Sequence, residues 1–500
     1  MRHGHAGRRQ AGALKRRRRA GLGGGQGRQQ QGGQGDNQGG EHGGKAAHPA
    51  TLPKDRGQRQ RPPARAAHNV TCKARRAPQL SRRPSCRVPI GGRRSCMRGL
   101  IRGSGATGTG RDLRVDLFRG LALFSIFVDH IPGNRLGELT LRNIAFCDAT
   151  EAFVLLAGYA AGLAYGAALD RRGWLFAAAS LLRRAGALYV AHIFLFVVFA
   201  AQVGYSAGLL DNPAYLDELH LDPFREQPYV ALLQALLLRY QPAFLDILPL
   251  YIALLVLLVP ALPLLRRPVL LLALSAVLYA AARLLDLNLP NWIDGGWFFN
   301  PFAWQLLFLA GAVLGYAPPG PDGRRGIPPA VPYRGWLVGG CVALLAFGAV
   351  AMLVAFEAPE WLALVPEQVG VVLTTIDKSA LHPLRLVSIL ALAYLLGHAV
   401  PRDAAWLRGR PAAPFLLMGQ HGLPVFCTGI FLSFLGRLAL EQSDRGPMQL
   451  AVNLAGLAAL VAVGAVAAWY RQRGEPAGGG RAAARAAGLP VPASSSTTAA

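Results

Sequence analysis

From Val115 onward, apolar segments long enough to cross a lipid bilayer recur along the chain. A transmembrane helix needs about 20 mostly apolar residues, because the hydrocarbon core is about 30 Å thick and a helix rises about 1.5 Å per residue. We therefore predict an all-α integral membrane protein with about ten transmembrane helices. They lie at residues 114–131, 150–169, 183–203, 244–264, 268–286, 298–316, 335–356, 384–400, 413–435 and 449–470.

The charges between these segments predict which helix ends face the cytoplasm. Short cytoplasmic loops carry an excess of Lys and Arg. With both termini inside, arginines fall in every cytoplasmic loop, whereas the external loops 204–243 and 357–383 are longer and more acidic. Segment 131–149 is then external. The predicted cytoplasmic arginines are Arg171, Arg172, Arg183, Arg184, Arg266, Arg267, Arg324, Arg325, Arg334, Arg402, Arg408, Arg410, Arg471 and Arg473.

The N-terminal segment differs in composition from the rest of the chain. Residues 1–110 hold 25 Lys or Arg and three Asp or Glu, against 28 and 24 in residues 111–500. Of the net charge of +26, +22 therefore belongs to this segment, and it does not indicate a specific nucleic-acid partner. Its Gly-, Gln- and Arg-rich composition cannot bury a core. We predict a disordered basic tail over 1–110, a membrane domain over 111–472 and a disordered tail over 473–500.

Two interpretations of residues 1–96 stay open. One is a disordered cytoplasmic arm that contacts anionic lipid headgroups or nucleic acid. The other is a translation start at Met97, which precedes a short polar leader. No apolar run near residue 1 indicates a cleavable signal peptide.

Neither the spacing of the cysteines nor any sequence motif indicates a metal centre. The six cysteines show neither a CxxC pair nor the Cys and His spacing of a zinc site, so neither a disulfide framework nor a metal site is predicted. Cys147 is either a nucleophile or a small apolar filler, and the filler is the commoner case. A Walker loop, a GxSxG elbow and an HExxH motif are also absent.

Ionisable residues gather at the predicted external end of the first helix. Asp129 and His130 end the helical segment, and Arg142, Asp148 and Glu151 follow within 21 residues. Ionisable residues at membrane depth are costly and usually mark function. His130 is a candidate general base, since the pKa of histidine lies near neutrality. Asp129 either orients it or binds a sugar hydroxyl. We favour catalysis over a structural interfacial histidine because of the neighbouring charges.

Polar residues at similar depth on other predicted helices indicate a shared internal cavity. The candidates for substrate binding there are Glu151, Asp246, Asp377, Gln420 and His421. Membrane helices place polar groups where partners or water meet them. Hydrogen bonding between helices is the alternative, and it accounts for Asp246 and Asp377 only if they reach Arg142 or Arg385.

Arg119 lies near the predicted cytoplasmic end of the first helix. Asp116 is three residues before it, so the two side chains share a helix face. One interpretation is a topology anchor or an ion pair within the helix. The other is a contact with an anionic substrate or cofactor at the cytoplasmic mouth.

Six stretches of the chain resemble the OpgC family, the membrane succinyltransferases of osmoregulated periplasmic glucans. They read DLFRGLALFSIFVDHIPGN, TLRNIAFCDATEAFVLLAGYAAGLAYG, QPAFLDILPLYIALL, NPFAWQLLF, DKSALHPLRLVSILALAYL and GQHGLPVFCTGIFLS. They cover about residues 111–470, and DHIPGN and FLDILPLY are the most specific of them. The resemblance implies about ten helices related to the membrane acyltransferases, in the inner membrane of a bacterium.

The resemblance also implies an activity. An acyl group, expected to be succinyl, passes from cytoplasmic acyl-CoA to hydroxyls of a periplasmic glucan, with no permanently bound cofactor. It implies His130 as the base, helped by Asp129 or Asp148. Our own inference adds Arg142 and Arg385 as partners of the succinyl carboxylate, because arginine binds carboxylates bidentately.

Several alternatives stay open at this stage. Arg142 or Gln420 is a candidate donor to the oxyanion. The route is direct transfer or an acyl intermediate on His130, and His421 is a rival base. A transporter or flippase for a glycan or acyl donor also needs polar groups at mid-membrane. A non-catalytic scaffold would not need intramembrane Asp and His on several helices.

Overall fold

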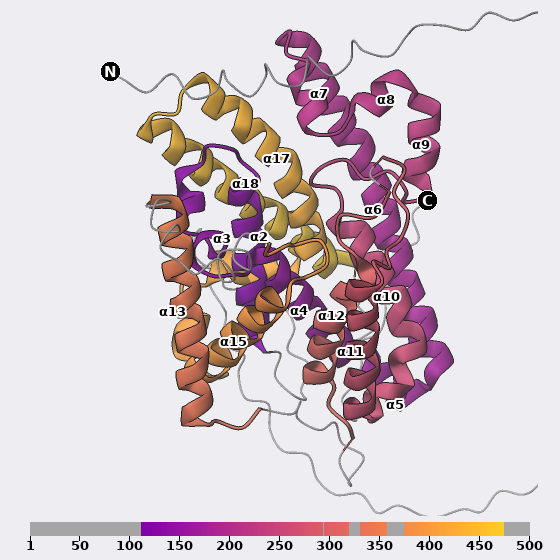
Figure 1. Ribbon diagram of the computed structural model, residues 1–500. Helices are drawn as coiled ribbons and strands as arrows, with labels where there is room; N and C mark the ends of the chain where they lie inside the picture. Colours follow the sequence, from indigo (N-terminus) through magenta and orange to yellow (C-terminus); the bar gives the residue numbers. More distant parts are fainter. Residues whose placement is uncertain (1–111, 294, 320–330, 358–374, 475–500) are drawn as a thin grey trace, which may run out of the picture. The chain divides into compact units, whose positions relative to one another are not determined.

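The computed structural model describes residues 112–293, 295–319, 331–357 and 375–474, all within the unit Pro89–Ala500. This part of the chain consists of helices and loops, and every segment predicted to cross the membrane falls on helices (Figure 1). The predicted all-helical class is therefore confirmed. The predicted tails, residues 1–110 and 473–500, lie outside the described residues, except that the last helix continues to Gly474.

The helices follow the chain in this order. The first half contains α2 (Leu113–Asp129), η1 (Arg135–Leu139), α3 (Leu141–Ile144), α4 (Ala149–Ala161), the π-helical turn η2 (Gly162–Gly166), α5 (Ala167–Arg172), α6 (Trp174–Leu209), α7 (Ala214–Glu218), α8 (Asp222–Glu226) and α9 (Pro228–Leu236). The second half contains α10 (Ile247–Ala261), η3 (Leu262–Arg266), α11 (Pro268–Leu284), α12 (Pro301–Gly315), α13 (Gly335–Glu357), α15 (Pro383–Ala399), η5 (Ala405–Arg408), α16 (Ala413–Gln420), α17 (Gly422–Gln442) and α18 (Gly446–Gly474).

Six helical stretches of the described chain are long and apolar enough to cross a membrane. They are Ala149–Arg172, Trp174–Leu209, Ile247–Arg266, Gly335–Val354, Gly422–Gln442 and Gly446–Arg473. Helices α11, α12 and α15 are apolar but shorter, and α2 carries charged residues. The chain is therefore a multi-pass membrane protein. The count of about ten spans and the orientation with both termini inside stay predictions.

Two predicted boundaries are wrong. Segment 413–435 is not one helix, because His421 has non-helical dihedral angles (φ −122°, ψ 43°) between α16 and α17. Helix α6 begins at Trp174, so Arg183 and Arg184 lie on a helix and not in a loop. Its 36 residues span about 54 Å, which exceeds the thickness of the hydrocarbon core. A helix of this length extends past the hydrocarbon core.

Helices α4 and α12 approach each other closely at glycines. A Cβ atom on Gly158 of α4 would meet the carbonyl oxygen of Phe308, and one on Gly315 of α12 would meet that of Tyr159. Small residues allow such backbone contact, which favours helix association in lipid, where no hydrophobic force drives it. Because α4 begins directly after the segment 131–149, this contact also fixes where the first turn of α4 lies.

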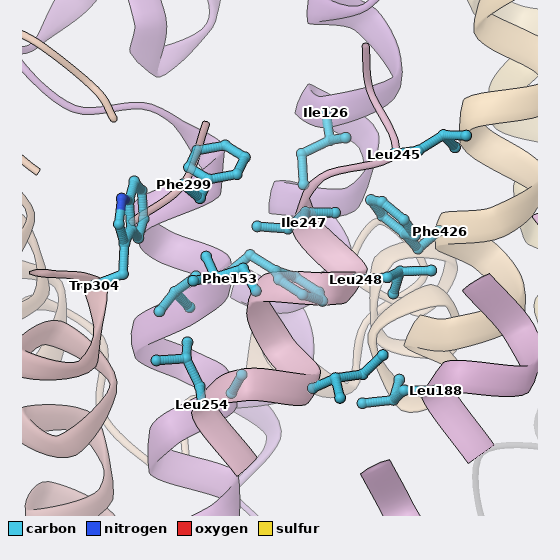
Figure 2. Packing of buried hydrophobic residues seen from close by; sticks show 14 of the residues in the cluster. Ile126, Phe153, Leu188, Leu245, Ile247, Leu248, Leu254, Phe299, Trp304 and Phe426 are labelled. Atoms are coloured by element: carbon cyan, nitrogen blue, oxygen red, sulfur yellow. The ribbon is translucent and has the colours of Figure 1, made fainter. Parts of the chain in front are cut away.

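Aromatic and aliphatic side chains from distant segments fill the centre of the described unit. Figure 2 shows Phe153 of α4, Leu248 of α10 and Phe426 of α17 close together. The ring centroid of Phe153 lies 6.4 Å from that of Tyr251 and 6.2 Å from that of Phe426. This apolar layer lies between two groups of polar residues, one around His130 and one around Arg119.

Candidate active site

His130 lies directly after the last residue of α2. Pro132 and Gly133, the latter at φ +76°, prevent the helix from continuing. The Nδ1 atom of His130 is 2.6 Å from the carbonyl oxygen of Ile126, one turn earlier. A carbonyl oxygen only accepts, so Nδ1 carries the proton and the neutral ring keeps its lone pair on Nε2. The ring packs edge-on against Phe244, at 4.6 Å between centroids. These contacts hold the ring in one orientation and leave the basic nitrogen available.

Asp129 does not orient His130. Its Oδ1 atom lies 2.7 Å from Oγ1 of Thr140, which is equally close to the carbonyl oxygen of Gly137. The predicted orienting role therefore belongs to the backbone at Ile126. Asp129 instead holds the end of η1 against the end of α2, and it is only partly buried.

Asp148 and Glu151 begin helix α4 as a capping box. The Asp148 side chain accepts a hydrogen bond from the backbone N–H of Thr150 at 2.7 Å, and Glu151 accepts one from the backbone N–H of Asp148 at 2.9 Å. Such a box satisfies donors that the first turn of a helix otherwise leaves unpaired. Sequence reasoning treated both residues as site residues and missed this local role, although the D-x-x-E spacing announces it.

Two cations neutralise these carboxylates, Lys378 in the segment before α15 and Arg385 in the first turn of that helix. Arg385 donates from Nε to Glu151 at 2.7 Å and from Nη2 to Asp148 at 3.1 Å. Nζ of Lys378 lies 2.6 Å from Asp148. Glu151 is fully buried, so it needs this partner. Arg385 was predicted to bind a substrate carboxylate, but the protein's own carboxylates already occupy it.

The pKa of Asp148 reflects this arrangement. Burial alone would raise it, but the nearby charges of Lys378 and Arg385 outweigh burial and hold the pKa well below its ordinary value. Asp148 is therefore ionised at neutral pH and is a poor proton acceptor. Asp129 and Asp148 were the two predicted helpers of His130. Among the described residues, neither of them forms a hydrogen bond with the His130 ring.

Lys378 is the residue that the predicted site omitted. Its ammonium group acts electrostatically on Asp129, His130 and Asp246 as well as on Asp148. It also faces the ring of Phe299, with Nζ 5.6 Å from the centroid. A signal was present in the sequence, because Lys378 directly follows Asp377 in a stretch already singled out. Lys378 thus joins α2, α4 and α10 to one centre.

Arg142 on α3 is exposed and makes no ion pair with any residue that the structure describes. Its charge nevertheless acts on Asp129 and His130. It is therefore a cation beside His130 that internal carboxylates do not occupy. Arg142 is therefore placed to bind an anionic group of a substrate that lies next to His130.

Asp377 lies apart from this centre. It pairs with Arg283 of α11 at 3.2 Å and accepts a hydrogen bond from the backbone N–H of Ala380 at 2.7 Å. The sequence interpretation considered only Arg142 and Arg385 as its partners, so that part is wrong. The pair holds the loop before α15 in place, and Lys378 follows directly in that loop.

Cys147 is buried beside this cluster. Burial, together with the charges of Glu151 and Asp148, raises the pKa of its thiol to about 12. Since the thiolate is the nucleophile, this residue fits the role of apolar filler and not that of a catalyst.

A cavity of about 250 Å³ lies on the other side of the apolar layer. Five elements contribute polar side chains to its lining: Arg119, Tyr165, Arg184, Tyr251 and Gln420. Gln420 is therefore grouped with Arg119 and not with His130. His421 is buried at the break between α16 and α17 and is not among the lining residues.

The two arginines of this cavity differ in their contacts. Arg119 donates to the carbonyl oxygens of Leu156 at 3.2 Å and Gly419 at 3.4 Å and lies 3.9 Å from Asp116. Arg184 makes no hydrogen bond or ion pair with another residue of the described chain, and sequence reasoning placed it only in a loop. A cavity that contains two cations is suited to an anionic ligand.

The cavity and the His130 cluster are adjacent along two helices. Phe153 and Leu248 line the cavity, and they lie two residues after Glu151 and Asp246, about 3 Å along each helix axis. Figure 2 shows Phe153 and Ile247 close to Leu248 in the buried hydrophobic cluster. The described residues hold no group of three or more His, Cys, Asp and Glu side chains arranged to bind a metal ion.

Comparison with known proteins gives one match. The family model described as OpgC protein matches residues 111–472, which covers more than half of the chain and nearly all of the described residues. No curated protein and no solved structure matches the chain.

Proposed function

This chain belongs to the OpgC family, which indicates a membrane enzyme of the acyltransferase type, and from this premise we propose its reaction. It transfers an acyl group, succinyl in our proposal, from cytoplasmic acyl-CoA to a hydroxyl of a periplasmic glucan. The observation that carries the proposal is the fixed tautomer of His130. The Ile126 carbonyl holds the proton on Nδ1 and leaves Nε2 as a base.

The chemistry follows from that nitrogen. Nε2 of His130 removes the proton of a glucosyl hydroxyl as its oxygen attacks the thioester carbonyl. A C–O bond forms, the C–S bond breaks, and the proton passes from the imidazolium to the departing CoA sulfur. General base catalysis of this kind contributes about 10²–10⁴-fold. No acyl intermediate on the protein is needed, because the hydroxyl that Nε2 of His130 deprotonates attacks the thioester carbonyl directly.

The acidic end of the acyl group meets Arg142. That guanidinium acts on His130 and pairs with no carboxylate of the described chain, whereas Arg385 is occupied by Asp148 and Glu151. An exposed arginine binds a carboxylate in a bidentate way without losing a partner. The cation therefore selects a dicarboxylic acyl group over acetyl.

The donor reaches His130 through the cavity that contains Arg119 and Arg184. Its volume of about 250 Å³ is below the range of about 300–1,000 Å³ for sites that enclose whole ligands. It therefore holds only the thioester arm of the donor. Arg119, Arg184 and Gln420 contact the polar groups of that arm, and its thioester passes Phe153 and Leu248 to reach His130.

A test uses the purified full chain in lipid vesicles with radiolabelled succinyl-CoA and a linear glucan. We expect His130→Ala to reduce label transfer at least a hundredfold and His421→Ala to reduce it severalfold at most. Transfer retained by the first variant and lost by the second would move the base to His421. Glucan that crosses the vesicle membrane while succinyl-CoA stays intact would indicate a transporter.

A further inference from the structure

A second and larger cavity, of about 820 Å³, lies between α13 and α15 on one side and α4 and α12 on the other. Helix α13 packs mainly against α15 and α3, and the two helices lie side by side in Figure 1. The walls are mostly aliphatic, including Leu155, Val313, Leu344 and Leu390. Lining residues on α15 run from Val387 to His398, a length of about 16 Å.

The polar lining residues of this cavity gather at one end. Arg114 donates to the carbonyl oxygens of Gly397 at 3.0 Å and Val400 at 2.9 Å, which joins the start of α2 to the end of α15. Asp112 pairs with Arg114 at 2.8 Å and with Arg402 at 3.5 Å. The loop charges predict this end to be cytoplasmic. The cavity is thus apolar along its length and polar at a single end.

The polar end is basic. Asp112 is the one carboxylate among its lining residues, against Arg114 and Arg402. His398 lies at the same end, where its Nδ1 is 2.8 Å from the carbonyl oxygen of Tyr394 and its Nε2 is 3.1 Å from that of Val331. The Arg402 side chain is 47% exposed, so it retains donors for a ligand.

Exposed aromatic residues surround the same end. Trp336 is 78% exposed, Tyr333 66% and Trp406 53%. The ring of Tyr333 lies 5.7 Å from that of His398. Tyr and Trp concentrate at the level of lipid headgroups, where one side of the ring is apolar and the other wet. This composition is typical of helix ends at headgroup depth.

We infer that this cavity binds an anionic phospholipid of the cytoplasmic leaflet, with an acyl chain between α13–α15 and α4–α12 and its phosphate at Arg402. Basic pockets between transmembrane helices on the cytoplasmic side are suited to anionic headgroups. The net positive charge selects an anionic lipid over a zwitterionic one. This site is independent of the proposed acyl transfer, because its lining does not include His130, Arg142 or Lys378.

The test measures lipid bound to the purified full chain by native mass spectrometry. Delipidated protein receives phosphatidylglycerol or phosphatidylethanolamine with identical acyl chains. Arg402→Ala should weaken phosphatidylglycerol binding about fivefold and weaken phosphatidylethanolamine binding less. The matched control is Arg408→Ala, in the same exposed loop but outside the lining.

A second pair of variants tests the apolar part of the site. Gly340 lines the cavity, and a Cβ atom there meets nothing within 4 Å, so Gly340→Phe should fill the groove and abolish binding of both lipids. Gly339→Phe is the matched control, since Gly339 is equally open but does not line the cavity.

Two results would overturn the inference. One is unchanged phosphatidylglycerol binding in both Arg402→Ala and Gly340→Phe. The other is equal binding of the two lipids by the unaltered protein, which would remove the role of the basic end. If a variant does not fold, the comparison of the two lipids on the unaltered protein still tests the inference. A phosphatidylglycerol with a photoreactive acyl chain should label α4, α12, α13 or α15, and labelling confined to helices outside this set would also contradict the inference.

Discussion

Arg142 and Arg385 carry the same guanidinium group in opposite electrostatic situations. Arg385 connects two carboxylates that begin α4, and Glu151 among them is fully buried. Arg142 is exposed and has no internal carboxylate among the described residues. A buried charge that loses its partner pays the full cost of desolvation, whereas an exposed one does not. Substitution of Arg385 should therefore mainly lower stability, whereas substitution of Arg142 should mainly weaken substrate binding.

We expect Arg385→Met to lower the free energy of unfolding by about 3–5 kcal/mol, read as a lower melting temperature of the protein in detergent. Arg142→Met should melt like the parent protein and raise the KM for succinyl-CoA by roughly ten- to a hundredfold, the value of a charge-assisted hydrogen bond. Its KM for acetyl-CoA should not change. An unstable Arg142→Met, or equal effects on both donors, would contradict this assignment.

At the level of helices, the crossing of α4 and α12 positions the site. Backbone contact at Gly158 sets the distance between these helices, and the capping box at the start of α4 depends on where that helix lies. A side chain inserted there has no space to move into, since the atom it meets is a backbone carbonyl. Overpacking of this kind costs more than the same change at a helix surface.

Gly158→Leu should therefore give only a small fraction of the parent chain's yield of monodisperse protein. The yield is measured by size-exclusion chromatography after solubilisation. Gly186→Leu is the matched control on α6, where a Cβ atom meets nothing within 4 Å. The control should elute like the parent chain. Normal elution of Gly158→Leu would mean that close approach of α4 and α12 is not required for folding.

At the scale of the whole molecule, the predicted orientation decides which side of the membrane supplies each substrate. Glu138 and Asp217 lie in segments predicted to be external, and Arg410 in one predicted to be cytoplasmic. All three are exposed in the structure. Their accessibility to a membrane-impermeant reagent therefore reports the orientation directly.

In a variant without native cysteines, Glu138→Cys and Asp217→Cys should react with an impermeant maleimide in intact cells. Arg410→Cys should react only after the membrane is opened. The readout is a mass shift of the full chain on a gel. Labelling of Arg410→Cys in intact cells would reverse the orientation and with it the proposed direction of acyl transfer.

Hydropathy and charge predicted the elements well, because both are local properties of the chain. Ten apolar segments fall on helices, and the end of α2 at His130 follows from Pro132 and Gly133. The break at His421 escaped prediction because the apolar runs on both sides of residues 419–422 merge into one hydropathy segment. The start of α6 escaped prediction because arginine, although charged, is a good helix former and does not end a helix.

The partners of the polar residues were decided by tertiary structure alone. Arg385 meets Glu151 across 234 positions of sequence, and Lys378 reaches residues of three helices. No local pattern encodes such pairs, because an ion pair depends on how helices pack and not on which residues are neighbours in the chain. The sequence by itself determined a helical membrane protein with a histidine at a helix end. Packing decided which charges are used within the protein and which remain for a substrate.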